Sequence, residues 1–168
     1  YERLPALVMD LVASDPYISA ERAAQLGAEL AEHDSFLDRA DFLTIHTPLT
    51  PETENLIGEE ELAKLEGGYV VNCARGGIID EPALAAAVED GTLAGAALAV
   101  FGDEPLPDAS PLLAVHDIIV TPHLAASTSA AHEPVPTSLA DHVLAAFPDE
   151  PVVNAPNPPS IQPAPFPP

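Results

Sequence analysis

Short apolar runs recur along the first part of the chain, and polar or helix-breaking residues end each of them. The run at 9–13 stops at Asp15 and Pro16, and the run at 42–46 stops before two closely spaced prolines. Short apolar runs of this kind are typical of buried strands in a parallel sheet. The pattern predicts strands at residues 9–13, 28–30, 42–46, 70–72, 96–101 and 118–121.

Helical patterns separate these strands. Ser19 can cap a helix over residues 20–26, and Asp80 can cap another over 82–89. Strands that alternate with helices at this spacing predict the α/β class, with a parallel sheet and helices on both faces. The remaining helices are expected at residues 35–40, at 50–65 with an interruption at Gly58, and at 127–147 with kinks at Pro134 and Pro136.

The chain is divided by composition into a domain and a tail. Residues 1–147 carry the strand and helix patterns, whereas residues 148–168 contain nine of the 20 prolines. Proline-rich segments favour extended conformations over packed elements. We therefore expect one domain at 1–147 and an extended tail at 148–168.

Charge limits the partners of this protein. The 168 residues include 27 acidic and 5 basic ones, which gives a net charge of -22. A nucleic acid or an anionic membrane would repel such a surface, so neither is expected as a partner. Self-repulsion of this size is relieved by salt, which favours a halophilic source over an ordinary acidic protein.

Cys73 is the only cysteine, so no intrachain disulfide can form and a cysteine-rich metal site is excluded. No apolar run reaches the roughly 20 residues that span a bilayer, and the N-terminus has no basic segment followed by an apolar one. These features predict a cytoplasmic protein without a bound metal.

Three polar side chains follow consecutive predicted strands: Arg75, Glu104 and His123. Because the carboxyl ends of parallel strands meet at one edge of a sheet, we expect the three to converge. An arginine can hold a carboxylate through two hydrogen bonds, and a histidine beside a glutamate can exchange a proton near neutral pH. Together they predict a site for a small 2-oxo or 2-hydroxy acid.

Each of the three residues also has an ordinary interpretation when it is taken alone. Arg75 could form a surface salt bridge, Glu104 could be one more solvated acid, and His123 could cap a loop. Only their shared placement favours a site. His46 ends a strand at the same edge and can line the cleft, whereas the other histidines are interpreted as surface groups: His33, His116, His132 and His142.

Five motifs follow one another in an order that resembles the D-isomer-specific 2-hydroxyacid dehydrogenases. They are DPY at 15–17, HTPLT at 46–50, NCARGGIIDE at 72–81, AGAALAVF at 94–101 continued by Glu104-Pro105, and PHLAAST at 122–128. Within this family the sequence is most similar to the enzymes that oxidise 3-phosphoglycerate to 3-phosphohydroxypyruvate in serine biosynthesis. The resemblance implies a Rossmann-like domain that uses NAD, in a protein that forms homo-oligomers.

The resemblance also implies roles for individual residues. Arg75 would bind the carboxylate and carbonyl of the substrate, His123 would be the acid/base, and Glu104 would hold and charge the histidine. Asp15 would hydrogen-bond the adenosine ribose of NAD. The residues that would line the cofactor cleft with it are Thr47, Cys73, Ala74, Arg75, Ala99, His123, Leu124, Ala125 and Ala126.

Several features depart from the family pattern. The first strand and its glycine-rich loop, Gly-x-Gly-x-x-Gly, do not occur in this sequence, nor does the substrate domain, so we expect little turnover from the chain by itself. Ala99 replaces an aspartate that contacts the nicotinamide carboxamide, and Ala125 replaces a glycine near the ring. Two alternatives stay open: a dehydrogenase for another 2-hydroxy acid, of the glycerate/hydroxypyruvate or glyoxylate type, or a non-catalytic remnant that acts as an interaction module.

Overall fold

A computed structural model describes residues 9–128, 139–140 and 144 of the chain. The chain separates into two compact units, Tyr1–His123 and Leu124–Pro168. All of the strands and all but the short helical pieces at 139–140 and 144 lie in the first unit. The predicted tail at 148–168 and the prolines at 134 and 136 lie outside the described residues, so those expectations stay predictions.

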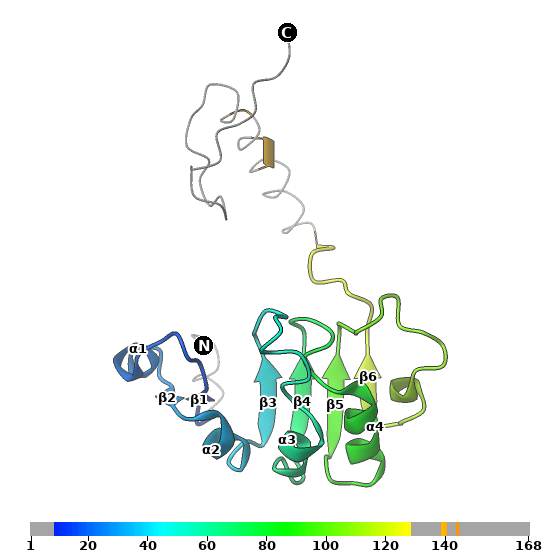
Figure 1. Ribbon diagram of the computed structural model, residues 1–168, viewed down its shortest axis with the longest axis horizontal. Helices are drawn as coiled ribbons and strands as arrows, with labels where there is room; N and C mark the ends of the chain where they lie inside the picture. Colours follow the sequence, from blue (N-terminus) through cyan, green and yellow to red (C-terminus); the bar gives the residue numbers. More distant parts are fainter. Residues whose placement is uncertain (1–8, 129–138, 141–143, 145–168) are drawn as a thin grey trace. The chain divides into compact units, whose positions relative to one another are not determined.

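The centre of the first unit is a four-stranded parallel sheet (Figure 1). Its strands lie in chain order, and Ile45, Asn72, Leu98 and Val120 align across it as register partners. A parallel ladder requires crossovers that return to the same starting edge, and the segments between the strands provide them. The strands are β3 (Phe42–Ile45), β4 (Tyr69–Asn72), β5 (Gly95–Leu98) and β6 (Ile118–Val120).

Two shorter strands form a separate parallel pair, β1 (Val12–Ala13) with β2 (Glu29–Leu30). Both are shorter than the apolar runs that predicted them, because only these residues meet a partner strand. The α/β class and the parallel sheet are confirmed.

Local capping explains where most helices begin. Ser19 Oγ accepts a hydrogen bond from the Arg22 amide at the start of α1 (Ala20–Gln25), and Asp80 Oδ1 accepts one from the Ala83 amide at the start of α4 (Glu81–Glu89). Both caps were predicted from the sequence. The remaining helical elements are α2 (His33–Leu37), α3 (Glu59–Ala63) and the 3-10 turn η2 (Pro111–Leu113).

Three predicted helices need correction. The helix expected at 35–40 begins at His33 and ends at Leu37. Residues 51–55 of the acidic region form turns, because the Thr53 hydroxyl accepts a hydrogen bond from the Thr50 amide and donates one to the Pro48 carbonyl. Ser127 and Thr128 are not helical, so the last predicted helix does not begin at 127.

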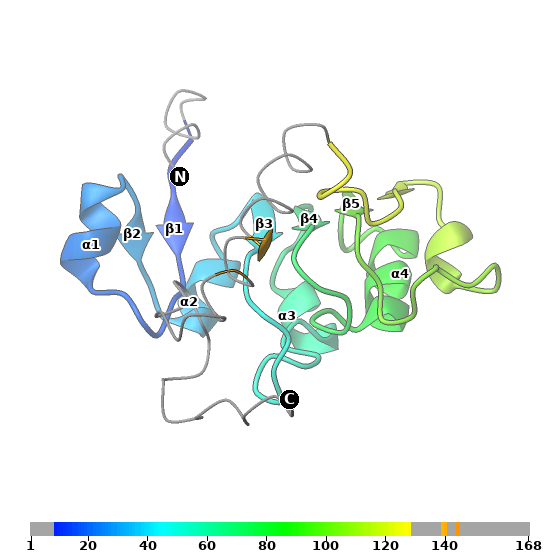
Figure 2. The ribbon, with the colours of Figure 1, turned by 90° about the horizontal axis from the view of Figure 1, so that it is seen from above.

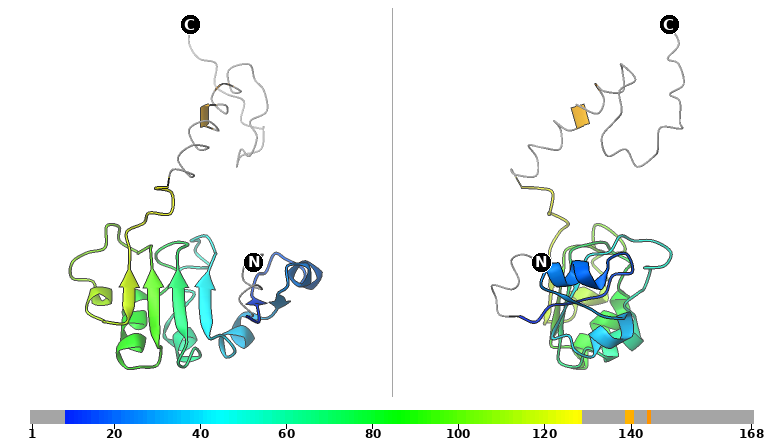
Figure 3. Two further views of the ribbon diagram at one scale, coloured as in Figure 1. Left: turned by 180° about the vertical axis from the view of Figure 1, so that it is seen from behind. Right: turned by 90° about the vertical axis from the view of Figure 1, so that its left-hand side faces the viewer.

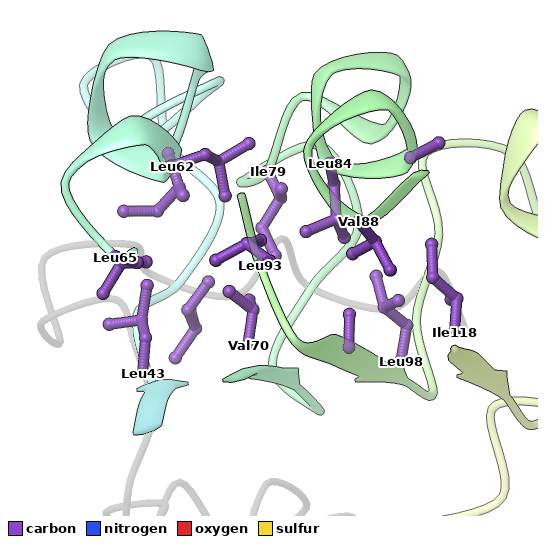
Figure 4. Packing of buried hydrophobic residues seen from close by; sticks show 14 of the residues in the cluster. Leu43, Leu62, Leu65, Val70, Ile79, Leu84, Val88, Leu93, Leu98 and Ile118 are labelled. Carbon is purple, nitrogen blue, oxygen red and sulfur yellow. The ribbon is translucent and has the colours of Figure 1, made fainter. Parts of the chain in front are cut away.

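One face of the four-stranded sheet is covered by α3 and α4, and Figure 4 shows the apolar side chains that fill the space between them. Leu62 and Leu65 lie over Leu43, and Leu93 lies over Val70. Leu84 and Val88 lie over Leu98 and Ile118. Each of these side chains is at least nine-tenths buried. Burial of a leucine side chain contributes about 1.5–3 kcal/mol, so this layer stabilises the edge from which the site is built.

Figure 3 (left) views the sheet from the opposite side. Phe42 and Tyr69 are register partners on neighbouring strands, and their rings stack at 5.1 Å. They are 55% and 44% exposed, and Ile119 on the same face is 65% exposed. Among the residues that the structure describes, no helix is long and apolar enough to cross a membrane.

Candidate active site

The three predicted catalytic residues lie just beyond the carboxyl ends of adjacent strands. Arg75 follows β4, Glu104 follows β5 and His123 follows β6. Since these strands are parallel and neighbours in the sheet, their following loops share one edge, which Figure 2 views from above. The predicted convergence therefore has a structural basis, although the roles of the residues stay predictions.

Glu104 and His123 are paired directly. Glu104 Oε2 lies 3.0 Å from His123 Nδ1, and Glu104 Oε1 accepts a hydrogen bond of 3.1 Å from the Phe101 amide. The hydrogen bond from His123, and after it that from Phe101, lowers the pKa of Glu104 below its ordinary value. An ionised carboxylate can only accept, so Nδ1 must carry the proton and Nε2 of the neutral imidazole has its lone pair free.

Removal of the His123 ring should raise the pKa of Glu104. In His123→Leu we expect a higher carboxyl pKa that still lies below the ordinary glutamate value, because the Phe101 amide continues to donate. The measurement is a pH titration of the Glu104 carboxyl carbon by NMR, with Glu104→Gln to identify the signal. Glu29, whose pKa is lowered by Arg39, is the internal control and should not move. An unchanged Glu104 midpoint would show that the pair does not form in solution.

The same shift predicts how the pair responds to pH. The folded-state pKa of Glu104 is depressed, so its ionised form stabilises the folded chain above the unfolded-state pKa. That contribution is lost as the pH falls through the lowered pKa. The pair is therefore intact at neutral pH.

Arg75 lies beside this pair without a hydrogen bond to it. Its side chain is exposed, and Nη1 donates to the carbonyl of Ala74 at 2.6 Å. The hydrogen bonds from His123 and Phe101 lower the pKa of Glu104 most, and the positive charge of Arg75 lowers it further by a smaller amount. The guanidinium therefore contributes positive charge at the same edge and can bind an anion there.

A backbone contact joins the loops that carry Arg75 and Glu104. Gly76 packs against the carbonyl of Phe101 so closely that a Cβ atom would overlap it. Glu81 Oε1, in the first turn of α4, accepts a hydrogen bond of 2.7 Å from the Gly102 amide. The loop that presents Glu104 is thus held by the backbone of Gly76 and by the side chain of Glu81.

Most of the predicted cofactor residues also follow strand ends. Asp15 follows β1, Thr47 follows β3, Cys73 and Ala74 follow β4, and Ala99 follows β5. The Thr47 hydroxyl is buried without a hydrogen-bond partner, and Asp15 Oδ1 accepts from the Tyr17 amide. A buried hydroxyl that lacks a partner suits a polar ligand. Ala99 offers no side-chain acceptor for a carboxamide.

Leu124, Ala125 and Ala126 belong to the second compact unit and are exposed within it. Their predicted place beside the cofactor therefore stays a prediction. In residues 9–128 and the described positions beyond them, no three metal-ligating side chains cluster.

The remaining histidines differ from one another. His46 is exposed, with Nε2 3.0 Å from the Thr44 hydroxyl, and lies at the expected edge after β3. His116 is exposed and contacts Asp117. His33, predicted to be a surface group, is only partly exposed: its Nε2 is buried without a hydrogen-bond partner, and its ring packs edge-on against Phe36. His132 and His142 lie outside the described residues.

The sequence analysis missed one residue at this edge. Asn72, the last residue of β4, is 1% exposed. Its side-chain amide donates a hydrogen bond to the carbonyl of Arg75 and accepts one from the amide of Ala74. A polar residue at the end of an apolar strand, directly before a turn, is the signal that could have revealed it.

Comparison with known proteins identifies the family of this chain. Residues 1–125 match the model of the D-isomer specific 2-hydroxyacid dehydrogenase, NAD binding domain. The chain belongs to this family. The predicted resemblance is confirmed, and NAD is the cofactor for which this class of domain is named.

Relatives of this chain carry consistent names. It is 47% identical to D-3-phosphoglycerate dehydrogenase of Mycobacterium leprae over 92% of this chain and 29% of the relative. It is 43% identical to the enzyme of that name from Archaeoglobus fulgidus, over 98% of this chain and 32% of the relative. The chain thus spans about a third of the length of these relatives.

Solved structures agree on the fold. D-lactate dehydrogenase of Lactobacillus jensenii with NAD+ superimposes with a TM-score of 0.80 at 27% identity, over 90% of this chain and 49% of that one. NAD-dependent formate dehydrogenase of Staphylococcus aureus, in complex with NAD, gives 0.80 at 30% identity, over 89% and 45%. The Rossmann-like fold predicted from the resemblance is confirmed.

Proposed function

We propose that this chain is the cofactor domain of an NAD-dependent dehydrogenase that oxidises the C2 hydroxyl of a D-2-hydroxy acid. The observation that carries the proposal is the Glu104–His123 pair, with His123 Nδ1 held at 3.0 Å and Arg75 at the same sheet edge. A general base, a group that orients it and a cation for the carboxylate are what this reaction requires from a protein.

Each of the three side chains has a distinct task in this proposal. Nε2 of His123 accepts the proton of the C2 hydroxyl, because Nδ1 already donates to Glu104. The Glu104 carboxylate then stabilises the imidazolium that forms. Arg75 binds the substrate carboxylate and orients C2, since the planar guanidinium matches the geometry of a carboxylate.

Bound NAD would supply the acceptor for the hydride that leaves C2. Thr47, Cys73 and Ala74 at the edge of the four-stranded sheet, and Asp15 after β1, are the residues that would hold it. An acid at the position of Asp15 favours NAD over NADP, because it pairs with the ribose 2′-hydroxyl and repels a 2′-phosphate.

The proposed substrate is 3-phosphoglycerate, the product 3-phosphohydroxypyruvate and the pathway serine biosynthesis. This choice rests on relatives named D-3-phosphoglycerate dehydrogenase at 43–48% identity. Because the chain spans only about a third of those relatives, the activity is proposed for the full-length protein, as are its homo-oligomeric state and cytoplasmic location. The chain by itself is expected to be inactive.

Two measurements test the proposal, both in molar KCl because of the acidic surface. Titration of NADH fluorescence with the full-length protein should show saturable binding, and NAD reduction should be faster with 3-phosphoglycerate than with D-glycerate or D-lactate. A faster reaction with another 2-hydroxy acid would correct the substrate and retain the reaction. Absence of both binding and turnover would instead support the non-catalytic interaction module.

A further inference from the structure

The turn that carries Arg75 contains a buried amide that the proposed chemistry does not use. Asn72 is 1% exposed and is the only buried polar side chain in the part of the chain that the structure describes. Burial of an amide costs free energy unless its donor and acceptor are both satisfied. The partners of Asn72 therefore indicate what it is for.

Both ends of the amide bind the backbone of the same turn. Asn72 Nδ2 donates to the carbonyl of Arg75 at 2.9 Å, and Asn72 Oδ1 accepts from the amide of Ala74 at 3.0 Å. One planar side chain thus holds the N–H of the 73–74 peptide group and the C=O of the 75–76 peptide group, which bracket Ala74 and Arg75. The backbone carbonyl of Asn72 accepts from the Ala99 amide, which holds the residue itself on β5.

The remaining side of the turn is closed by other contacts. Gly76 packs on the Phe101 carbonyl, and the carbonyl of Gly77 accepts from the Asn55 amide at 2.8 Å. Neither contact is a hydrogen bond to the peptide group that precedes Ala74 or to the one that follows Arg75. Asn72 alone among the described side chains hydrogen-bonds the carbonyl of Arg75.

We propose that Asn72 is a positioning residue that sets the direction of Arg75 toward the substrate carboxylate by holding the Ala74 amide and the Arg75 carbonyl. The kinetic part of this proposal rests on the proposed dehydrogenase function. The structural part, which concerns the turn alone, does not.

The first test needs no activity. In Asn72→Leu, whose side chain is similar in size but cannot hydrogen-bond, the Ala74 amide should exchange with solvent about tenfold faster relative to the Val71 amide. Val70→Ala is the matched control, because Val70 is fully buried two residues earlier on β4 and touches none of these hydrogen bonds. It should accelerate both amides equally. Unchanged relative exchange in Asn72→Leu would overturn the proposal, whatever the function of the protein.

The second test separates positioning from stability in the full-length enzyme. Asn72→Leu should raise KM for the 2-hydroxy acid about tenfold and leave the pH dependence of kcat, which depends on His123 and Glu104, unchanged. Partial unfolding would instead lower kcat at constant KM, as expected for Val70→Ala. With Arg75→Ala in the background, Asn72→Leu should have little further effect on KM.

A full additional KM effect in the Arg75→Ala background would show that Asn72 acts elsewhere and would overturn the proposal. If wild-type protein shows no turnover, the proposed function fails while the exchange experiment still decides the role of Asn72 in the turn.

Discussion

Replacement of His123 by asparagine in the full-length protein is expected to lower kcat by about 10²–10⁴-fold, the usual contribution of a general acid/base. Asparagine can place its amide near the position of Nδ1 and so can still donate to Glu104, which is 3.0 Å away. It has no group at the position of Nε2 that can take a proton. The loss should therefore appear in the chemical step, in single-turnover or steady-state measurements.

The matched control is His46→Asn. His46 lies at the same edge after β3, but its Nε2 is next to the Thr44 hydroxyl and no carboxylate orients it. Its replacement should change kcat by less than about tenfold. Equal losses in the two variants would mean that His123 is not the acid/base. A loss only in His46→Asn would assign that role to His46.

The second large effect is expected at Gly76. A methyl group at this position would overlap the carbonyl of Phe101 and would lie 2.5 Å from the nitrogen of Gly102. These are backbone atoms, which cannot rotate away as a side chain could. Gly76→Ala should therefore lower the free energy of unfolding by about 3 kcal/mol, at the upper end of the range for overpacking.

Gly102→Ala is the control for the Gly76 substitution. It adds the same methyl group across the same contact, but the nearest atom would be a carboxylate oxygen of Glu81 at 3.6 Å, an ordinary van der Waals distance. Its effect should be within about 0.5 kcal/mol. Urea unfolding of both variants at one KCl concentration measures the difference. Equal stability would show that the Gly76–Phe101 approach is looser in solution.

If Gly76→Ala remains folded, the enzyme should also lose activity, because the Arg75 turn and the Glu104 loop must separate to admit the methyl group. The two proposed functional elements are therefore linked by packing as well as by charge. The glycine directly after Arg75 thus has a steric reason in this structure.

Strand and helix positions were largely predictable from the sequence, because they depend on local patterns. Five of the six strands were predicted by apolar runs with a proline or glycine within the next few residues, and the sequence also predicted the caps Asp80 and Ser19. The errors lie where local preference is weak. Residues 51–55 have a helical composition, but the Thr53 hydroxyl holds them in turns.

For the candidate site, the sequence by itself determined which residue types follow the strand ends: an arginine, a glutamate and a histidine. It also determined the family, through the order of five motifs. The strand order that makes these residues neighbours is a non-local property, since Arg75 and His123 are separated by two crossovers.

Only the tertiary structure decided how that site is held. The pairing of Glu104 with His123, the lack of room for a side chain at Gly76 and the burial of Asn72 all depend on atoms that meet in three dimensions. Short-range sequence patterns report the conformation of single elements, whereas hydrogen bonds and steric limits between loops arise only when strands pair in register. The sequence therefore predicted the candidate chemistry, and the packing of β4 against β5 revealed Asn72 as the residue that positions Arg75 in our proposal.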